Sequence, residues 1–294
     1  MLIRGCPKVS LGYGQGFFAE PADAGNRYNR ERFHTMNGQH HIIPDVRETC
    51  LFLSEYAVQL FGSGCTCIRL EKNMKRIAAS LGMSVEFSIL PRHIHITVSQ
   101  GTTDFTSVVG IRDLPISYSR ITDLSRLSWQ IADGKLDFEE ARAVLPRVCN
   151  CSCVNPWMLT TLVSIANASF CRLFNGGPLA MAVVFIATFA GFLLKRLLLS
   201  RHIDMRVTVF LCAFLSSLIA SGASVSGIVD TPDIAVATSV LYLVPGIPFI
   251  NSFCDLIDRH YLCAFGRAMN AAVLLCCLSL GLCAGMALMH LDMF

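Results

Sequence analysis

The second half of this chain contains five nearly uncharged windows, and each is long enough for a helix to cross a lipid bilayer. Such a helix needs roughly 20 predominantly apolar residues. Its backbone N–H and C=O groups are hydrogen-bonded to one another within the helix, as the lack of water in the bilayer core requires. Buried core helices of a soluble protein are the alternative, but five consecutive segments of this kind would be very unusual there. We therefore expect a multi-pass α-helical membrane protein with five transmembrane helices. The windows are residues 155–173, 178–194, 207–229, 234–253 and 268–289.

Charge divides the chain into two parts. Only 15% of the residues are charged and 53% are hydrophobic, whereas a soluble domain averages about 25% charged residues. The first 157 residues hold 17 of the 24 basic and 15 of the 21 acidic residues. We expect a flexible N-terminal tail over residues 1–41, a cytoplasmic α+β domain over 42–148 and a transmembrane domain over 149–294.

The short connections between the windows predict the orientation. The second connection carries Lys195, Arg196, Arg201 and Arg206, and the fourth carries Arg259, whereas the first and third carry no basic residue. Basic loops stay in the cytoplasm, which places the N-terminus inside and the C-terminus outside a plasma (inner) membrane. The opening residues lack the continuous apolar region of a secretory signal, in agreement with a cytoplasmic domain.

Cysteine usage suits a reducing compartment. The 14 cysteines are scattered through the expected cytoplasmic domain and the apolar windows, where a thiol behaves as a small hydrophobe. One cluster, Cys149, Cys151 and Cys153, has C-x-C-x-C spacing without the usual C-x-x-C pairing. A metal or redox role for it stays an alternative, but we expect neither a metal nor a cofactor.

Apolar periodicity predicts the cytoplasmic domain as a helix pair, a three-stranded antiparallel meander and a second helix pair. Asp45 with Glu48, and Asp137 with Glu140, have the spacing of a capping box at a helix start. The last helix is expected to end at Pro146. The helices are expected at residues 45–64, 66–81, 119–132 and 137–145, and the strands at 85–89, 94–98 and 106–112.

Enzyme signatures are missing from the sequence. His93 and His95 would lie on one face of a strand, a geometry that metal sites use, but Ile94 and Ile96 take the other face, so a polar sheet surface is the alternative. We find no G-x-S-x-G, Walker loop, H-E-x-x-H or dinucleotide motif. No catalytic residue is expected, and the lack of a basic block argues against a nucleic-acid partner.

The fourth window ends in "LVPGIPFINSFCDLI", which predicts a helix broken near its cytoplasmic end. Pro245 and Pro248 lack amide donors, and Gly246 lies between them. Irregular backbone at membrane depth implies a cavity, a common way to build a transporter's substrate site. Asn251 and Asp255 follow one turn apart, and an acid in an apolar site favours its neutral form. Asp255 is therefore our candidate for exchanging protons during transport, the alternative being a helix cap or a salt bridge to Arg259 or Arg267.

Other polar residues in or beside the windows are lower-weight candidates for a substrate path. Small hydroxyl residues usually let membrane helices approach closely, so packing is their alternative role. The candidates are Asn167, Asn175, Ser221, Thr238 and Arg267.

These motifs together resemble the threonine/serine exporter family, specifically its N-terminal component. The resemblance spans residues from about 46 to the C-terminus, and its most specific part is Pro-Gly-x-Pro-x-x-Asn followed by an Asp, matched by Pro245, Gly246, Pro248, Asn251 and Asp255. "DGKLDFEEA" and, more loosely, "GSGCTCIRLEKNMKRIAASLG" also match. Because the chain stops after five windows, it is similar to the split form, whose partner is a separate five-span protein.

The resemblance implies export of small hydrophilic metabolites, either threonine/serine-type amino acids or succinate-type organic acids. We expect a proton-motive-force-driven transporter subunit acting in a hetero-oligomer with that second five-span membrane protein. The alternative is a non-transporting membrane subunit whose cytoplasmic domain senses a ligand or scaffolds a complex.

Overall fold

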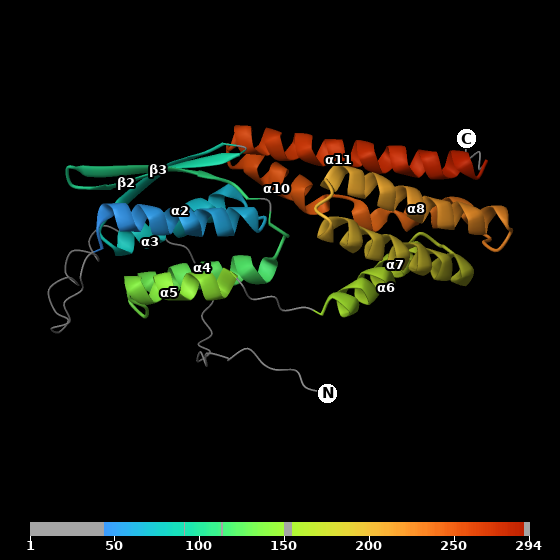
Figure 1. The fold of residues 1–294 in the computed structure, drawn as a ribbon, viewed down its shortest axis with the longest axis horizontal. Helices are drawn as coiled ribbons and strands as arrows, with labels where there is room; N and C mark the ends of the chain where they lie inside the picture. The colour runs from blue at the N-terminus through green and yellow to red at the C-terminus, as the bar shows by residue number, and fades with distance from the viewer. Residues whose placement is uncertain (1–43, 91, 113, 150–154, 291–294) are drawn as a thin grey trace, which may run out of the picture. The chain divides into compact units, whose positions relative to one another are not determined.

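A computed structural model describes residues 44–90, 92–112, 114–149 and 155–290 of the chain. The expected tail, the expected turn at Pro91, and Cys151 and Cys153 lie outside the described residues. From Pro44 onward the described residues belong to one compact unit. Its first elements are α2 (Val46–Gly62), α3 (Cys67–Ser80), β1 (Ser84–Ile89), β2 (His93–Gln100), β3 (Thr103–Gly110), α4 (Tyr118–Ala132) and α5 (Phe138–Cys149) (Figure 1).

The three strands form the predicted antiparallel meander, in the order β1-β2-β3. Alternation along β2 buries Ile94, Ile96 and Val98 completely, and helix α2 packs on this face of the sheet. His93 and His95 point to the opposite, exposed face. The sheet thus has one face in the core and one polar face.

A polar network ties three helices of this domain together inside the apolar core. The hydroxyl of Tyr56 in α2 donates to the carbonyl of Leu124 in α4 at 2.9 Å and accepts from the Asn73 amide in α3 at 3.1 Å. Buried polar groups are stabilising only when they are paired. This network therefore fixes how α2, α3 and α4 pack.

The two predicted capping boxes have different outcomes. Asp45 occupies the N-cap of α2, but its side chain makes no capping hydrogen bond, so the first box is wrong. At α5 the Asp137 amide donates to the Glu140 carboxylate at 3.1 Å, as predicted. Helix α5 also continues through Pro146 to Cys149. The proline leaves only an exposed carbonyl without its helical partner, and Val148 and Cys149 pack on the core.

Three described helices are long and apolar enough to cross a bilayer, or up to four if one bent pair counts as a single span. The bent pair covers the predicted fourth window. Helix α6 covers the first window but does not meet the same requirement, because polar residues such as Asn167 and Arg172 interrupt it. The five predicted spans are thus established only in part. The elements are α6 (Pro156–Leu173), α7 (Pro178–Ser200), α8 (Met205–Val225), α9 (Pro232–Ser239), the 3-10 turn η2 (Leu241–Leu243), α10 (Gly246–Ile257) and α11 (Tyr261–Leu288).

The predicted break is present, but it lies midway through the segment and not near its end. The two halves, Pro232–Leu243 and Gly246–Ile257, meet at an angle of 63°. Pro245 is the N-cap of α10 and Pro248 lies in its first turn, where a missing amide costs no helical hydrogen bond. The prolines therefore start the second half rather than distort the middle of a helix.

Helix α11 lies beside α8, and glycines let the two approach closely (Figure 1). A Cβ at Gly281 would collide with the backbone carbonyl of Phe210, and one at Gly285 would meet the Ser217 side chain at 2.7 Å. Ser217 also donates across this interface to the Leu282 carbonyl at 2.9 Å. Small residues and an interhelical hydrogen bond are the usual means of helix association in membranes.

We expect Gly281→Ala to destabilise the α8–α11 pair by about 1–3 kcal/mol, because the colliding atom is backbone and cannot rotate away. Thermal denaturation of the purified protein in lipid nanodiscs measures the effect. Gly222→Ala in α8 is the matched control, since the new methyl would meet only the end of Met289 at 3.9 Å. An equal melting temperature for Gly281→Ala and the wild type would contradict this packing.

Candidate functional site at the α2–α3 turn

The second half of the broken segment presents polar side chains along one face. Asn251 and Asp255 are separated by one helical turn of α10, and Asp255 is fully buried. Ile250, Phe253 and Ile257 are exposed on the other side of the helix, each by more than 60%. The polar face of α10 is therefore covered by protein while its apolar face is not.

Asp255 has two partners from distant parts of the chain. One carboxylate oxygen accepts a hydrogen bond from the Cys67 amide at the start of α3, at 2.8 Å and 188 residues away in sequence. The other lies 2.8 Å from a guanidinium nitrogen of Arg267 in α11. A carboxylate at a helix N-terminus is stabilised by the helix dipole and by unpaired amides. Asp255 thus caps α3. Thr66, which occupies the N-cap position, makes no capping hydrogen bond with its side chain.

Asn251 and Arg267 hold the same turn at two further points. The Asn251 amide donates to the Gly64 carbonyl at 2.7 Å, and Arg267 donates to the Cys65 carbonyl at 2.7 Å. The Arg267 guanidinium also lies 4.5 Å from the centre of the Phe61 ring, within range of a cation–π interaction. We call Asn251, Asp255 and Arg267 the turn clamp.

The α2–α3 turn contains glycines that let neighbouring parts of the chain pack closely against it. A Cβ at Gly62 would meet the Arg112 carbonyl at 2.5 Å, and Gly64 has a φ of +93°, which favours glycine. Cys65 is almost completely buried, and this burial raises the pKa of its thiol to about 12, against the opposing positive charge of Arg267. The turn clamp therefore closes over a dry, tightly fitted segment.

The connection between α10 and α11 is fixed beside the turn clamp. The His260 amide donates to the backbone carbonyl of Asp255 at 2.8 Å, and Arg259 takes a left-handed φ of 64°. The Ser252 hydroxyl donates to the Ala264 carbonyl at 2.7 Å. Movement of α10 relative to α11 would break these bonds together with the Asp255–Arg267 pair.

Of the predicted pathway residues, the structure brings together Asn251, Asp255 and Arg267. All three contact the α2–α3 turn from α10 and α11. Pro245, Gly246 and Pro248 lie at the break, one to two turns before Asn251. The salt bridge to Arg267, which the sequence left as an alternative, is present. Arg259 is exposed and takes no part.

Two of the lower-weight candidates meet at the other half of the broken segment. The Asn167 amide of α6 donates to the Thr188 hydroxyl of α7 at 2.6 Å and to the Thr238 carbonyl of α9 at 2.9 Å. Ser221 is buried in α8 without a hydrogen-bond partner for its hydroxyl among the described residues. Asn175 forms the α6–α7 turn with a φ of 65°.

The sequence reading missed one polar contact close to the break. The Tyr242 hydroxyl in η2 and the Ser216 hydroxyl in α8 share a hydrogen bond of 3.0 Å. They meet at Gly191, whose missing side chain leaves room for the tyrosine. A tyrosine three residues before Pro245 in an apolar window was the available signal, because a buried phenol needs a partner.

No metal centre forms from the described parts of the chain. No group of three His, Cys, Asp or Glu side chains there is placed to hold an ion. Cys149 is partly buried at the end of α5. The turn clamp, with one buried acid, one arginine and one amide, binds backbone groups of the α2–α3 turn.

Comparison with known proteins places these features in a transporter family. The family described as "Putative threonine/serine exporter" matches residues 51–289. The chain belongs to this family. It is therefore a membrane protein of a family of exporters, and the resemblance inferred from Pro245 to Asp255 is confirmed.

Two curated relatives carry a more specific name. The chain is 27% identical to the "Probable succinate transporter subunit YjjP" of Klebsiella aerogenes, over 83% of this chain and 92% of the relative. It is also 27% identical to the protein of that name from Escherichia coli K12, over 78% of this chain and 88% of the relative. No solved structure matches the chain. The names of these relatives support a role as one subunit of a transporter.

We expect the Asp255→Asn variant to open the α2–α3 turn, because an amide cannot neutralise Arg267 and a buried charge without its partner costs about 3–5 kcal/mol. Cys65 would then become accessible, and its pKa would return toward about 8.5, which increases the thiolate fraction by roughly three orders of magnitude. Maleimide labelling at neutral pH, read at Cys65 by mass spectrometry, measures this change.

Asp258→Asn provides the matched control, since Asp258 is exposed three residues further along. Cys65 should stay unreactive in the wild type and in this control. Slow labelling of Cys65 in Asp255→Asn as well would show that the turn clamp does not keep the turn closed.

Proposed function

We propose that this chain is one subunit of a secondary transporter that exports small, carboxylate-bearing hydrophilic metabolites, of the threonine/serine or the succinate type. The observation that carries the proposal is Asp255, a fully buried acid on the half-helix that follows the break, with its oxygens on Cys67 and Arg267. Family membership supports export, and the relatives' names support the subunit role.

The broken segment is proposed to form the transport site together with the partner. The irregular backbone at Val244 and Pro245 lies between two half-helices that meet at 63°, and transporters use such broken helices to bind polar groups. Carboxylates are shared by threonine, serine and succinate, so one class of contact serves all three. Asn167 and Thr238 on the other half, with Tyr242 at the break, are candidates for the remaining polar surface.

Proton coupling is proposed to act at Asp255. While ionised, the carboxylate attracts Arg267 and accepts from the Cys67 amide. When it takes up a proton, the attraction to Arg267 is lost and the turn clamp loosens, which frees α10 to move relative to α11. Binding of the proton would thus release the α2–α3 turn and allow the half-helix α10 to move.

The proposed setting is a plasma (inner) membrane, with α2–α5 in the cytoplasm and the C-terminus outside. In this arrangement α6 is a fifth span, whose Asn167 side chain is paired with α7 and α9. The partner is proposed to be a second five-span membrane protein. Five spans from each would give a ten-span exporter.

Efflux measurements on the paired subunits test the proposal. Cells or proteoliposomes holding this chain and its partner are loaded with labelled succinate or labelled threonine, and efflux is followed with and without a protonophore. We expect one of the two to leave the wild type, with the protonophore abolishing most of this efflux.

Asp255→Asn should reduce that efflux by at least about tenfold, whereas Asp258→Asn should retain it. If both labelled compounds stay inside although both subunits insert correctly, export of these metabolites is wrong. The ligand-sensing or scaffolding role of the cytoplasmic domain would then explain the chain better.

A further inference from the structure

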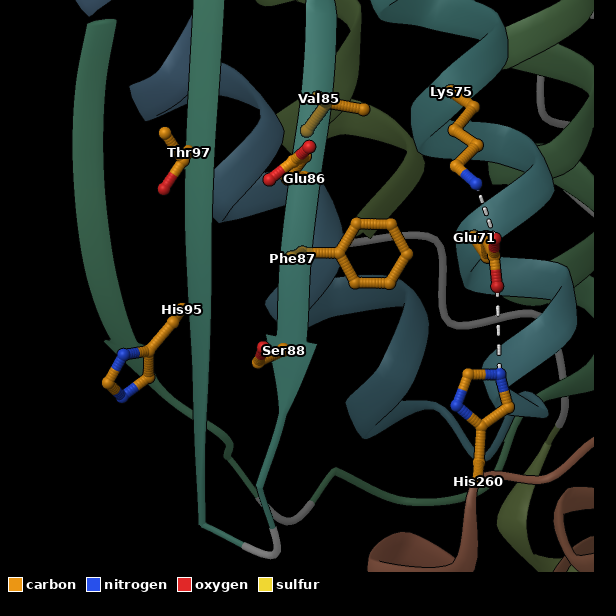
Figure 2. A pocket seen from close by; sticks show the side chains of 9 residues that line it. All are labelled: Glu71, Lys75, Val85, Glu86, Phe87, Ser88, His95, Thr97 and His260. Carbon is orange, nitrogen blue, oxygen red and sulfur yellow. Dashed lines mark hydrogen bonds and ion pairs between the residues drawn. The ribbon is translucent and has the colours of Figure 1, made fainter.

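A cavity of about 420 Å³ lies beside the turn clamp and takes no part in it. It is bounded by the free edge of β1, by helix α3 and by the α10–α11 connection, and Figure 2 shows its lining side chains. Its volume falls in the range of about 300–1,000 Å³ that small-molecule sites occupy. The cavity therefore has room for a metabolite and some water.

One end of the cavity is acidic. Glu86 of β1 is exposed on the polar face of the sheet, where it is paired across the strands with Thr97, while Ser88 is paired with His95. Within the described part of the chain, the Glu86 carboxylate has neither a hydrogen bond nor an ion pair. A free carboxylate beside hydroxyl groups is suited to accept hydrogen bonds from an ammonium group.

The opposite end carries an ion pair and an imidazole. Lys75 donates to Glu71 at 2.6 Å, and His260 lies 3.6 Å from the other oxygen of the same carboxylate (Figure 2). Glu71 thus accepts a hydrogen bond from Lys75 and has the His260 imidazole close to its other oxygen. The lysine ammonium has three donors and uses one on Glu71, so Lys75 and His260 can still donate to an added carboxylate.

The wall between the two ends is apolar. Figure 2 shows the Phe87 ring pointing from β1 toward α3, between Glu86 and the Lys75–Glu71 pair. A ligand spanning the cavity would pass this ring with its carbon skeleton. The cavity therefore combines the Glu86 carboxylate, the Phe87 ring and the side chains of Lys75, Glu71 and His260.

We propose that this cavity binds a small zwitterion of the amino-acid class, with its ammonium group on Glu86 and its carboxylate on Lys75 and His260. A dicarboxylate would place its second negative charge against Glu86, and a diamine would place a second positive charge against Lys75. The dicarboxylate is disfavoured by like-charge repulsion at Glu86, and the second ammonium of the diamine cannot accept from Lys75 or His260. The charge pattern thus selects a ligand that carries one charge of each sign.

The position of His260 gives this binding a consequence. His260 precedes α11 directly, and its amide donates to the Asp255 backbone carbonyl at 2.8 Å. A ligand that engages His260 would fix the α10–α11 connection and so the turn clamp. Resting on the proposed function, the cavity is an effector site through which a cytoplasmic amino acid regulates the exporter.

Titration calorimetry on the full-length chain in nanodiscs, without its partner, tests the binding. The probes are L-serine and L-threonine as zwitterions, succinate as a dicarboxylate and 1,4-diaminobutane as a diamine. We expect heat of binding from at least one zwitterion and none from the other two probes. Glu86→Gln should weaken binding at least about tenfold, which is the usual effect of losing a charge-assisted hydrogen bond.

Asp104→Asn is the matched control, because Asp104 is another exposed acid of the same sheet, paired with Ser99 at its far end. The Asp104→Asn variant should bind the zwitterion with the affinity of the wild type. Melting curves of Glu86→Gln and Asp104→Asn show whether each variant is folded. Absence of zwitterion binding, tighter binding of succinate, or equal affinity in Glu86→Gln and the wild type would each overturn the proposal.

The efflux assay separates the two proposals. In one outcome, the chain binds a zwitterion through Glu86, but the chain and its partner export neither labelled compound. This result would retain the cavity as a binding site and contradict the proposed function. Proton-dependent efflux without such binding would retain the exporter and contradict the effector site.

Discussion

The buried pair of Asp255 and Arg267 is the interaction on which the junction of this protein depends. Two charges out of water are tolerated only when their remaining hydrogen-bonding capacity is also satisfied. Here the Cys67 amide and the Cys65 carbonyl supply those bonds, and both belong to the α2–α3 turn. The pair therefore depends on the α2–α3 turn being docked on α10 and α11.

This dependence gives the broken segment a mechanical meaning. A break at Val244–Pro245 leaves α10 as a half-helix of 12 residues, attached to α9 through an irregular connection and to α11 through a short one. Such a half-helix needs an external support, and the turn clamp supplies it on the polar face. The same face would have to be released for α10 to move, which is the step that we propose for protonation of Asp255.

Much of the fold could be predicted from the sequence, since it follows from local patterns. The alternation in β2 and the helical spacing in α3 identified the meander and the helix pair, and Pro245 with Pro248 identified the break. The first apolar window stays a prediction as a span, because Asn167 and Arg172 lower its mean hydropathy. The end of α5 was misplaced because packing of Val148 and Cys149 outweighs the local effect of Pro146.

The candidate site could be predicted only in part. The spacing of Asn251 and Asp255 placed them on one helix face, and Arg267 was one of two basic residues weighed as a partner for the acid. Their common target, the turn at Gly64 and Cys65, could not be found, because a contact across 188 residues leaves no periodicity in a single sequence.

Amide hydrogen exchange at Cys67 tests the central claim, that Asp255 holds the start of α3, most directly. In the wild type in nanodiscs the Cys67 amide should exchange slowly, although first-turn amides of a helix are normally unpaired and exchange fast. Asp255→Asn should accelerate exchange at Cys67 while the interior amides of α4 keep their rates. Fast exchange at Cys67 in the wild type, or equal rates in the two proteins, would contradict the account.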